Sequence, residues 1–158
     1  MKTIVIGLGN PILGDDGVGW VVAEEVKRQI DPDLHVDVDC LSLGGISLME
    51  HLIGYDRAIL IDAFVSHEPV GSIIVLKLDE LPDVSAFHLT SAHDMSLKNA
   101  LKLGRQMGAK LPVDITVAGI SAKHVYDFSE ELSLPVSEAI PKATQIVVDL
   151  LMQNIIVH

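Results

Sequence analysis

Short apolar segments alternate with longer amphipathic ones along this chain of 158 residues. Segments of the first kind have the length and composition of buried strands, and those of the second kind have the periodicity of helices packed on one face. A chain that alternates strands and helices buries both in a layered α/β domain. We therefore expect an α/β three-layer sandwich in which a mostly parallel, mixed five-stranded sheet is flanked by helices. Residues 1–158 are expected to form one domain.

The individual elements can be placed from these patterns. The segment from Ile59 to Ile61 is apolar without alternation, as expected for a strand that is covered on both faces. The segment from Gly71 to Leu76 follows a short loop with no helix between, so we expect it to pair antiparallel to the strand before it. The stretch from Asp79 to Ser91 is predicted to be a long loop. Strands are predicted near residues 2–7, 35–41, 57–62, 71–78 and 113–119, and helices near 17–30, 44–54, 93–107 and 135–153.

The composition limits the kind of protein. With 49% hydrophobic and 21% charged residues, the chain can form a substantial core, and disorder is not expected. A net charge of −11 argues against a nucleic-acid partner, because binding to a phosphate backbone requires clustered lysine and arginine. The single cysteine excludes an internal disulfide, no signal-peptide pattern is visible, and there is no apolar run of about 18 residues to span a membrane. We expect a cytoplasmic protein that binds neither nucleic acid nor membrane.

A loop with two consecutive carboxylates follows the first predicted strand. Residues 7–19 read Gly-Leu-Gly-Asn-Pro-Ile-Leu-Gly-Asp-Asp-Gly-Val-Gly, and they connect an apolar run to an amphipathic helix. In a right-handed βαβ arrangement the first helix leads to one neighbour of strand one, and a later crossover brings strand three to its other side. The crevice at the carboxyl ends of these two strands is the usual ligand site of such sheets. Asp16 lies just beyond strand one and Asp62 terminates strand three, so both carboxylates are expected to project into the crevice.

His93 is the third candidate for this cluster. It follows Thr90 and Ser91, either of which could cap a helix that continues through Lys98 and Leu101. The partial positive charge of a helix N-terminus disfavours the imidazolium form, which leaves a neutral ring nitrogen able to bind a metal. Two carboxylates and one imidazole form an incomplete shell that accepts nickel, zinc, cobalt, manganese or iron. The donor types alone do not choose among these metals.

Three stretches carry a resemblance to a known family. They are the loop at residues 7–19, the sequence Leu60-Ile61-Asp62-Ala63 and the sequence Ser91-Ala92-His93. With them the chain resembles, over nearly its whole length, the nickel-iron hydrogenase maturation endopeptidases, which remove a C-terminal extension from the hydrogenase large-subunit precursor. In that family an acidic residue in the first loop, an aspartate after the third strand and a histidine opening a later helix contact the metal. The matching residues here are Asp16, Asp62 and His93.

The chain departs from the family pattern at two places. Some members have glutamate where this chain has Asp16, so the arm is one methylene shorter and the ligand type is unchanged. Residues 40–45 read Cys-Leu-Ser-Leu-Gly-Gly, where relatives often have an acid followed by Gly-Gly-Thr. The second departure concerns a loop that is predicted to face the substrate.

The resemblance also implies a metal and a partner. The metal would be nickel, supplied by the substrate because it already lies in the active site of the precursor. The partner would be a nickel-iron hydrogenase large-subunit precursor, cut shortly after its last cysteine motif and following a basic residue. Either a metal-held water attacks the peptide bond, or a carboxylate serves as base while the metal positions the precursor. The sequence leaves both routes open.

Structural roles are an alternative for each residue taken alone. Asp15 or Asp16 could cap the first helix, although one cap cannot explain both. Asp62 could bind loop amides at a strand end, and His93 could be satisfied by local hydrogen bonds. A metal-contacting site is favoured because all three residues are predicted to lie at one edge of the sheet.

Other functions share parts of the pattern. A dinucleotide-binding loop is disfavoured, because Ile12 occupies the position of the third glycine and the two carboxylates would repel a pyrophosphate. Residues 7–11 also resemble the opening of peptidyl-tRNA hydrolases, but the Tyr and Arg-His-Asn that those enzymes use next are missing. A metal-sensing chaperone that binds the precursor without cutting it would use the same three site residues. Only a cleavage assay separates that chaperone from an endopeptidase.

Overall fold

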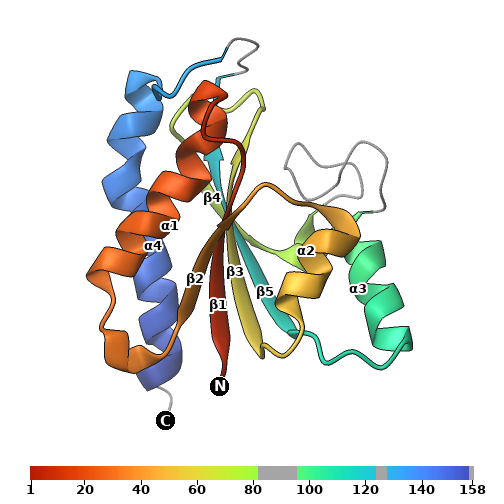
Figure 1. The fold of residues 1–158 in the computed structure, drawn as a ribbon. Helices are drawn as coiled ribbons and strands as arrows, with labels where there is room; N and C mark the ends of the chain where they lie inside the picture. Colours follow the sequence, from red (N-terminus) through yellow and green to blue (C-terminus); the bar gives the residue numbers. More distant parts are fainter. Residues whose placement is uncertain (82–95, 124–127, 157–158) are drawn as a thin grey trace.

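The computed structural model describes residues 1–81, 96–123 and 128–156. Its strands are β1 (Thr3–Leu8), β2 (Asp37–Leu41), β3 (Arg57–Phe64), β4 (Ile73–Lys77) and β5 (Asp114–Ser121), and its helices are α1 (Val18–Gln29), α2 (Gly45–Leu52), α3 (Leu97–Gln106) and α4 (Leu134–Ile156). Short 3-10 turns are η1 (Gly14–Gly17), η2 (Pro32–Leu34) and η3 (Leu78–Glu80). The sheet forms the middle layer, with α1 and α4 on one face and α2 and α3 on the other (Figure 1). The predicted α/β three-layer sandwich is confirmed.

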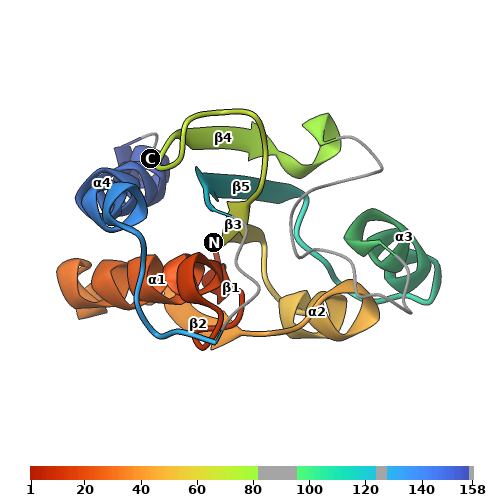
Figure 2. The ribbon, with the colours of Figure 1, turned by 90° about the horizontal axis from the view of Figure 1, so that it is seen from above.

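The five strands lie in the order β2-β1-β3-β5-β4, as seen from above in Figure 2. β1 pairs in parallel with β2 and with β3, and β3 pairs in parallel with β5. β4 runs antiparallel, which confirms the mixed sheet, but its partner is β5. The expected pairing of β4 with β3 is therefore wrong. β5 offers β3 a long, almost entirely buried partner, whereas β4 is short and partly exposed, as suits an edge strand.

The central strands are covered on both faces. Every residue of β1 and β3 is buried, and the side chains of β3 alternate between two apolar clusters. Ile59 and Ile61 pack on the side of α1 and α4, while Leu60 and Phe64 pack on the side of α2 and α3. This double coverage explains why the strand reads as a continuous apolar run in the sequence.

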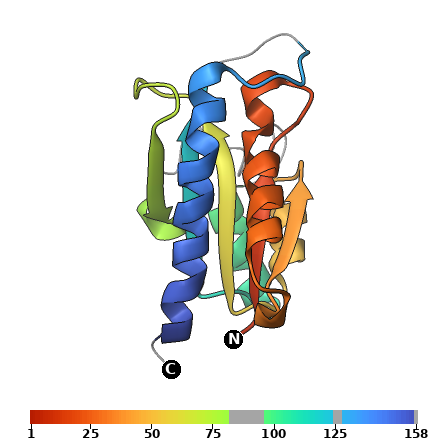
Figure 3. The ribbon, with the colours of Figure 1, turned by 90° about the vertical axis from the view of Figure 1, so that its left-hand side faces the viewer.

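The helices bury one stripe each. In α1 the buried side chains Val18, Val22 and Val26 recur every four residues and face the sheet and α4. In Figure 3 α1 and α4 lie side by side across the sheet. In α3 the buried residues Leu97 and Leu101 have the same spacing. Amphipathic periodicity of this kind is what made the helices visible in the sequence.

Three differences from the predicted boundaries concern the candidate site and the loop near it. β3 continues to Phe64, so Asp62 lies inside the strand and does not terminate it. α3 begins at Leu97 after the extended residue Ser96, whose side chain accepts a hydrogen bond from the backbone N–H of Asn99 at 3.3 Å. The predicted start of this helix at residue 93 is therefore too early. The predicted loop from Asp79 begins instead with the end of η3, and most of it lies outside the described residues.

Candidate active site

The carboxyl ends of β1 and β3 form a topological switch point. The two strands are neighbours, with Gly7 of β1 opposite Ile61 of β3. From β1 the chain crosses through α1 to β2 on one side, and from β2 it returns through α2 on the other face to reach β3 (Figure 2). Connections that diverge in this way leave a crevice at the strand ends. The predicted adjacency of strand one and strand three is confirmed.

Asp62 is a fully buried carboxylate in β3. Its exposed fraction is 0%, which is rare for an acidic side chain. Because side chains alternate along a strand, Asp62 lies on the same face as Leu60 and Phe64, toward α2 and α3. Its partner in β5 is Gly119, which contributes no side chain. A carboxylate at this position of an apolar sheet costs free energy, and such a cost is tolerated where the group has a function.

Asp16 lies in η1, just beyond β1. One of its carboxylate oxygens accepts a hydrogen bond from the backbone N–H of Asn10 at 2.8 Å, and the side chain is half-buried. Gly9 has φ +130°, and a Cβ at that position would lie 2.0 Å from the backbone oxygen of Asp16. The loop therefore folds back on itself so tightly that only glycine fits there.

Gly19 brings this loop over the strand ends. A Cβ at Gly19 would lie 2.4 Å from the backbone oxygen of Leu8 and 2.5 Å from that of Ile61. The first turn of α1 thus rests directly on the ends of β1 and β3, and η1 lies against β3. The structure places Asp16 and Asp62 at the same end of two adjacent strands.

His93 falls outside the described residues, so its place beside the two carboxylates stays a prediction. Within residues 1–81, 96–123 and 128–156, no group of three or more His, Cys, Asp or Glu side chains could hold a metal ion. Asp16 and Asp62 are the two of the three predicted site residues that the structure locates.

Asp15 has a different role from its neighbour. The N-cap of α1 is Gly17, with no side-chain cap, so the suggestion that Asp15 or Asp16 caps this helix is wrong. Asp15 is 1% exposed and accepts hydrogen bonds from the backbone N–H of Lys123 and from Ser133. Sequence reasoning gave this residue no such role, because its partners are more than one hundred positions away.

The loop after β2 is hydrogen-bonded to α1 and to the loop after β1. The indole N–H of Trp20 donates to the backbone oxygen of Leu41 at 3.1 Å, and the hydroxyl of Ser42 donates to that of Gly9 at 2.6 Å. Burial, with the nearby carboxylates of Glu24 and Asp39, raises the pKa of the Cys40 thiol to about 11. A thiol with this pKa is protonated at neutral pH, so Cys40 does not supply a thiolate nucleophile.

The fold recurs in known proteins. The sequence model of the hydrogenase maturation protease family matches residues 20–150. The chain belongs to that family. The hydrogenase 2 maturation protease of Escherichia coli is 29% identical over 122 residues, which cover 76% of this chain and 73% of that protein.

Solved structures agree with this assignment. The hydrogenase maturating endopeptidase HybD from Escherichia coli superposes with a TM-score of 0.81 at 25% identity, covering 98% of this chain and 94% of that one. The NiFe hydrogenase maturation protease HybD from Thermococcus kodakarensis has a TM-score of 0.69 at 26% identity, covering 95% and 99%. Hydrogenase maturation proteases are endopeptidases, so the chain is an enzyme of this class.

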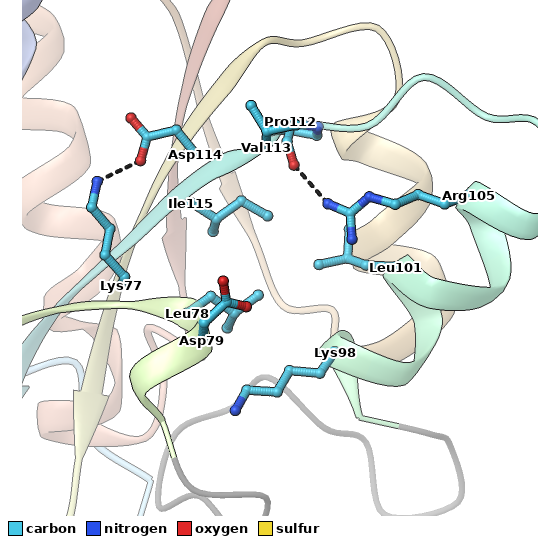
Figure 4. Close-up of a pocket in the computed structure, with 10 residues that line it drawn as sticks. All are labelled: Lys77, Leu78, Asp79, Lys98, Leu101, Arg105, Pro112, Val113, Asp114 and Ile115. Carbon is cyan, nitrogen blue, oxygen red and sulfur yellow. Dashed lines mark hydrogen bonds and ion pairs between the residues drawn. The ribbon is translucent and has the colours of Figure 1, made fainter.

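A second cleft of this hydrogenase maturation protease lies away from the crevice. It has a volume of about 360 Å³ between α3, η3 and the amino end of β5 (Figure 4). Asp62 pairs with Gly119, toward the other end of β5. Its cations are already engaged: Lys77 pairs with Asp114 at 2.5 Å, Arg105 donates to the backbone oxygen of Pro112 at 2.8 Å, and Lys98 donates to that of Leu81. These bonds hold neighbouring segments together, so we interpret the cleft as a structural contact and not as a ligand site.

Across residues 1–81, 96–123 and 128–156, no helix is both long and apolar enough to cross a bilayer.

Proposed function

We propose that this protease removes the C-terminal extension of a nickel-iron hydrogenase large-subunit precursor after nickel has been inserted. The observation that carries the proposal is the position of Asp16 and Asp62 at the carboxyl ends of neighbouring strands, in a fold shared with a hydrogenase maturating endopeptidase over almost the whole chain. The relative from Thermococcus kodakarensis is named as a NiFe hydrogenase maturation protease, which supports the nickel-iron class of substrate.

Asp16, Asp62 and His93 are the residues that we propose contact the nickel carried by the precursor. Carboxylate and imidazole donors suit nickel among other divalent metals. Three protein ligands leave coordination positions for groups that the precursor supplies. Recognition of the precursor would then test whether metal insertion is complete. This explains why a protease would need the metal of its substrate.

The same carboxylates serve the peptide-bond cleavage. The residues admit two routes, in which a carboxylate acts as general base toward water or the nickel polarises the water or the scissile carbonyl. Both routes need an ionised carboxylate facing the crevice. The raised pKa of the Cys40 thiol disfavours a third route through a cysteine nucleophile at neutral pH.

The cellular setting follows from the substrate. A precursor that acquires its metal before assembly is processed where it is made, so we place the reaction in the cytoplasm, as predicted from the sequence. The charge of −11 is unfavourable for nucleic acid and compatible with a basic peptide segment. The cytoplasmic location and the absence of nucleic-acid and membrane partners stay predictions.

Incubation of the purified protein with nickel-loaded and nickel-free precursor tests this function. We expect cleavage of the loaded precursor only, with release of a C-terminal peptide that mass spectrometry identifies. We also expect the isolated protease to contain little metal, because its open ligand set binds free ions weakly. Efficient cleavage of precursor never exposed to nickel, in metal-free buffer, would indicate a conventional hydrolase. Binding of loaded precursor without cleavage would indicate a metal-sensing chaperone.

Variants of the three residues complete this test. Asp16→Asn, Asp62→Asn and His93→Gln should each abolish processing and leave the protein folded. Asp79→Asn is the matched control, because Asp79 is an exposed carboxylate in the second cleft. If Asp79→Asn also lost processing, the effect would come from the negative charge of the protein as a whole and not from the three site residues.

A further inference from the structure

Asp15 is a buried carboxylate that joins three distant segments of the chain. It is 1% exposed. Its Oδ1 accepts from the backbone N–H of Ser133 at 2.6 Å, and its Oδ2 accepts from the hydroxyl of Ser133 at 2.8 Å and from the backbone N–H of Lys123 at 3.0 Å. Burial of a carboxylate is costly unless several donors compensate its charge, and here three donors do so.

The segments that Asp15 joins converge at the carboxyl end of the sheet. Asp15 lies in η1 after β1, Lys123 follows the end of β5, and Ser133 immediately precedes α4. Main-chain bonds reinforce the contact, because the N–H of Gly14 donates to the oxygen of Ser129 at 2.6 Å and the N–H of Ser129 donates to that of Ile12 at 2.8 Å. The first loop is therefore fixed to the connection between β5 and α4.

Asp16 is the next residue and points elsewhere. A 3-10 turn has about three residues per turn, so consecutive side chains are separated by about 120°. Asp15 can thus face the connection between β5 and α4 while Asp16 accepts the N–H of Asn10 at 2.8 Å. Both side chains depend on the same turn, so a shift of Asp15 shifts Asp16.

We propose that Asp15 is a positioning residue, which holds η1 against the segments at Lys123 and Ser133 and thereby fixes the direction of the Asp16 carboxylate. The proposal rests on the proposed function in so far as Asp16 serves processing. It explains why two consecutive carboxylates occur in this loop. One is anchored inside the protein, and the other is presented at the crevice.

A graded series of variants separates the bonds of Asp15. Ser133→Ala removes only the hydroxyl bond and keeps both main-chain donors. Asp15→Asn keeps the shape but has one acceptor oxygen in place of two, so it cannot satisfy the N–H groups of Lys123 and Ser133 together. Asp15→Ala removes every bond. Leu151→Ala is the control, since it opens a cavity in α4, away from the loop, and lowers stability by another route.

The direct readout is hydrogen exchange of the Asn10 amide, whose N–H is held by Asp16. Its exchange is measured by NMR relative to the amide of Leu60 in the centre of β3, which reports global unfolding. We expect the relative exchange rate to rise slightly in Ser133→Ala, more in Asp15→Asn and by about tenfold or more in Asp15→Ala. Leu151→Ala should leave this ratio unchanged.

Processing of nickel-loaded precursor is measured on the same proteins, below their melting temperatures. We expect rates to fall in the same order, by about 10–100-fold for Asp15→Asn, because supporting residues of a metal-contacting group have effects of this size. Unchanged Asn10 exchange in both Asp15 variants, or an equal rise in Leu151→Ala, would overturn the proposal. If the wild-type protein does not cleave the precursor, the proposed function is wrong, and Asn10 exchange still decides whether Asp15 positions Asp16.

Discussion

Asp62 of β3 pairs with Gly119 of β5, so a fully buried carboxylate has a neighbour without a side chain. The residues before and after Asp62 in β3 point to the opposite face of the sheet, where they pack into the apolar cluster under α1 and α4. A fully buried carboxylate is unusual in this mostly apolar strand. It lies toward the end of β3 where we propose the site.

The first prediction follows from this burial. Asp62→Asn removes a charge from a position with 0% exposure, so the variant should be within about 1 kcal/mol of wild type or more stable. Processing should nevertheless be abolished, because a neutral amide is a poor metal ligand and no base. Urea unfolding and cleavage of nickel-loaded precursor measure the two effects separately. Near-normal processing by Asp62→Asn would refute its role, with Asp79→Asn as the exposed control.

The second prediction concerns a buried cation at the opposite end of the sheet. The guanidinium of Arg57 is 3.3 Å from the carboxylate of Asp114 and donates to the backbone oxygen of Leu150 in α4 at 2.8 Å. Arg57→Ala should lower the free energy of unfolding by about 1–3 kcal/mol, because it removes the hydrogen bond that a charged, buried guanidinium donates to the oxygen of Leu150. Asp114 keeps Lys77 as a partner, so the larger cost of an isolated buried charge is not expected.

Lys77→Ala is the matched comparison. It breaks an ion pair with the same Asp114, but the Lys77 side chain is 54% exposed and that of Arg57 only 5%. Exposed pairs contribute little, so this variant should lose less than about 1 kcal/mol. Urea unfolding measures both losses of unfolding free energy. Equal losses in Arg57→Ala and Lys77→Ala would show that burial does not determine how much each side chain contributes.

Much of the arrangement could be predicted because local patterns and handedness determine it. The apolar run at residues 59–61 indicated a covered strand, and right-handed crossovers allowed β1 to lie beside β3. Asp62 could be placed near the crevice for the same reasons. These inferences use only short stretches of sequence and general rules of chain connection.

The features that were not predicted depend on contacts between distant segments. β4 follows β3 in sequence but pairs with β5, because a later strand gave β3 a longer buried partner. The bonds of Asp15 to Lys123 and Ser133 leave no periodic pattern, and any main-chain N–H can serve as such a donor. The start of α3 was misplaced because several serine and threonine residues precede it, and Ser96 is the one that caps.

The third prediction concerns the reactivity of Cys40. Burial and the carboxylates of Glu24 and Asp39 raise the pKa of its thiol from 9.0 to about 11. Because only the thiolate reacts with iodoacetamide, the alkylation rate of the folded protein should be half-maximal near pH 11. For the unfolded protein in urea the rate should be half-maximal near pH 9.0 and should level off above that pH. Cys40→Ala should retain processing, and its loss would mean that the thiol takes part in the site.

The fourth prediction concerns alkaline stability and the bond between Tyr55 and Asp37. The hydroxyl of Tyr55 donates to the carboxylate of Asp37 at 2.5 Å, and this bond, followed by burial, raises the pKa of Tyr55 from 10.0 to about 12. A phenolate cannot donate and is repelled by the carboxylate, so the folded state favours the protonated phenol. The stabilisation is complete below pH 10 and is lost as the pH rises toward 12.

Tyr55→Phe isolates this contribution. The difference in unfolding free energy between wild type and Tyr55→Phe should be constant below pH 10 and should shrink between pH 10 and 12. Subtraction cancels the contributions of the groups that the two proteins have in common. Asp37→Asn is the control, because it keeps an acceptor for the hydroxyl but removes the negative charge. A wild-type-minus-variant difference that stays flat to pH 12 would mean that the bond to Asp37 does not hold the proton on Tyr55.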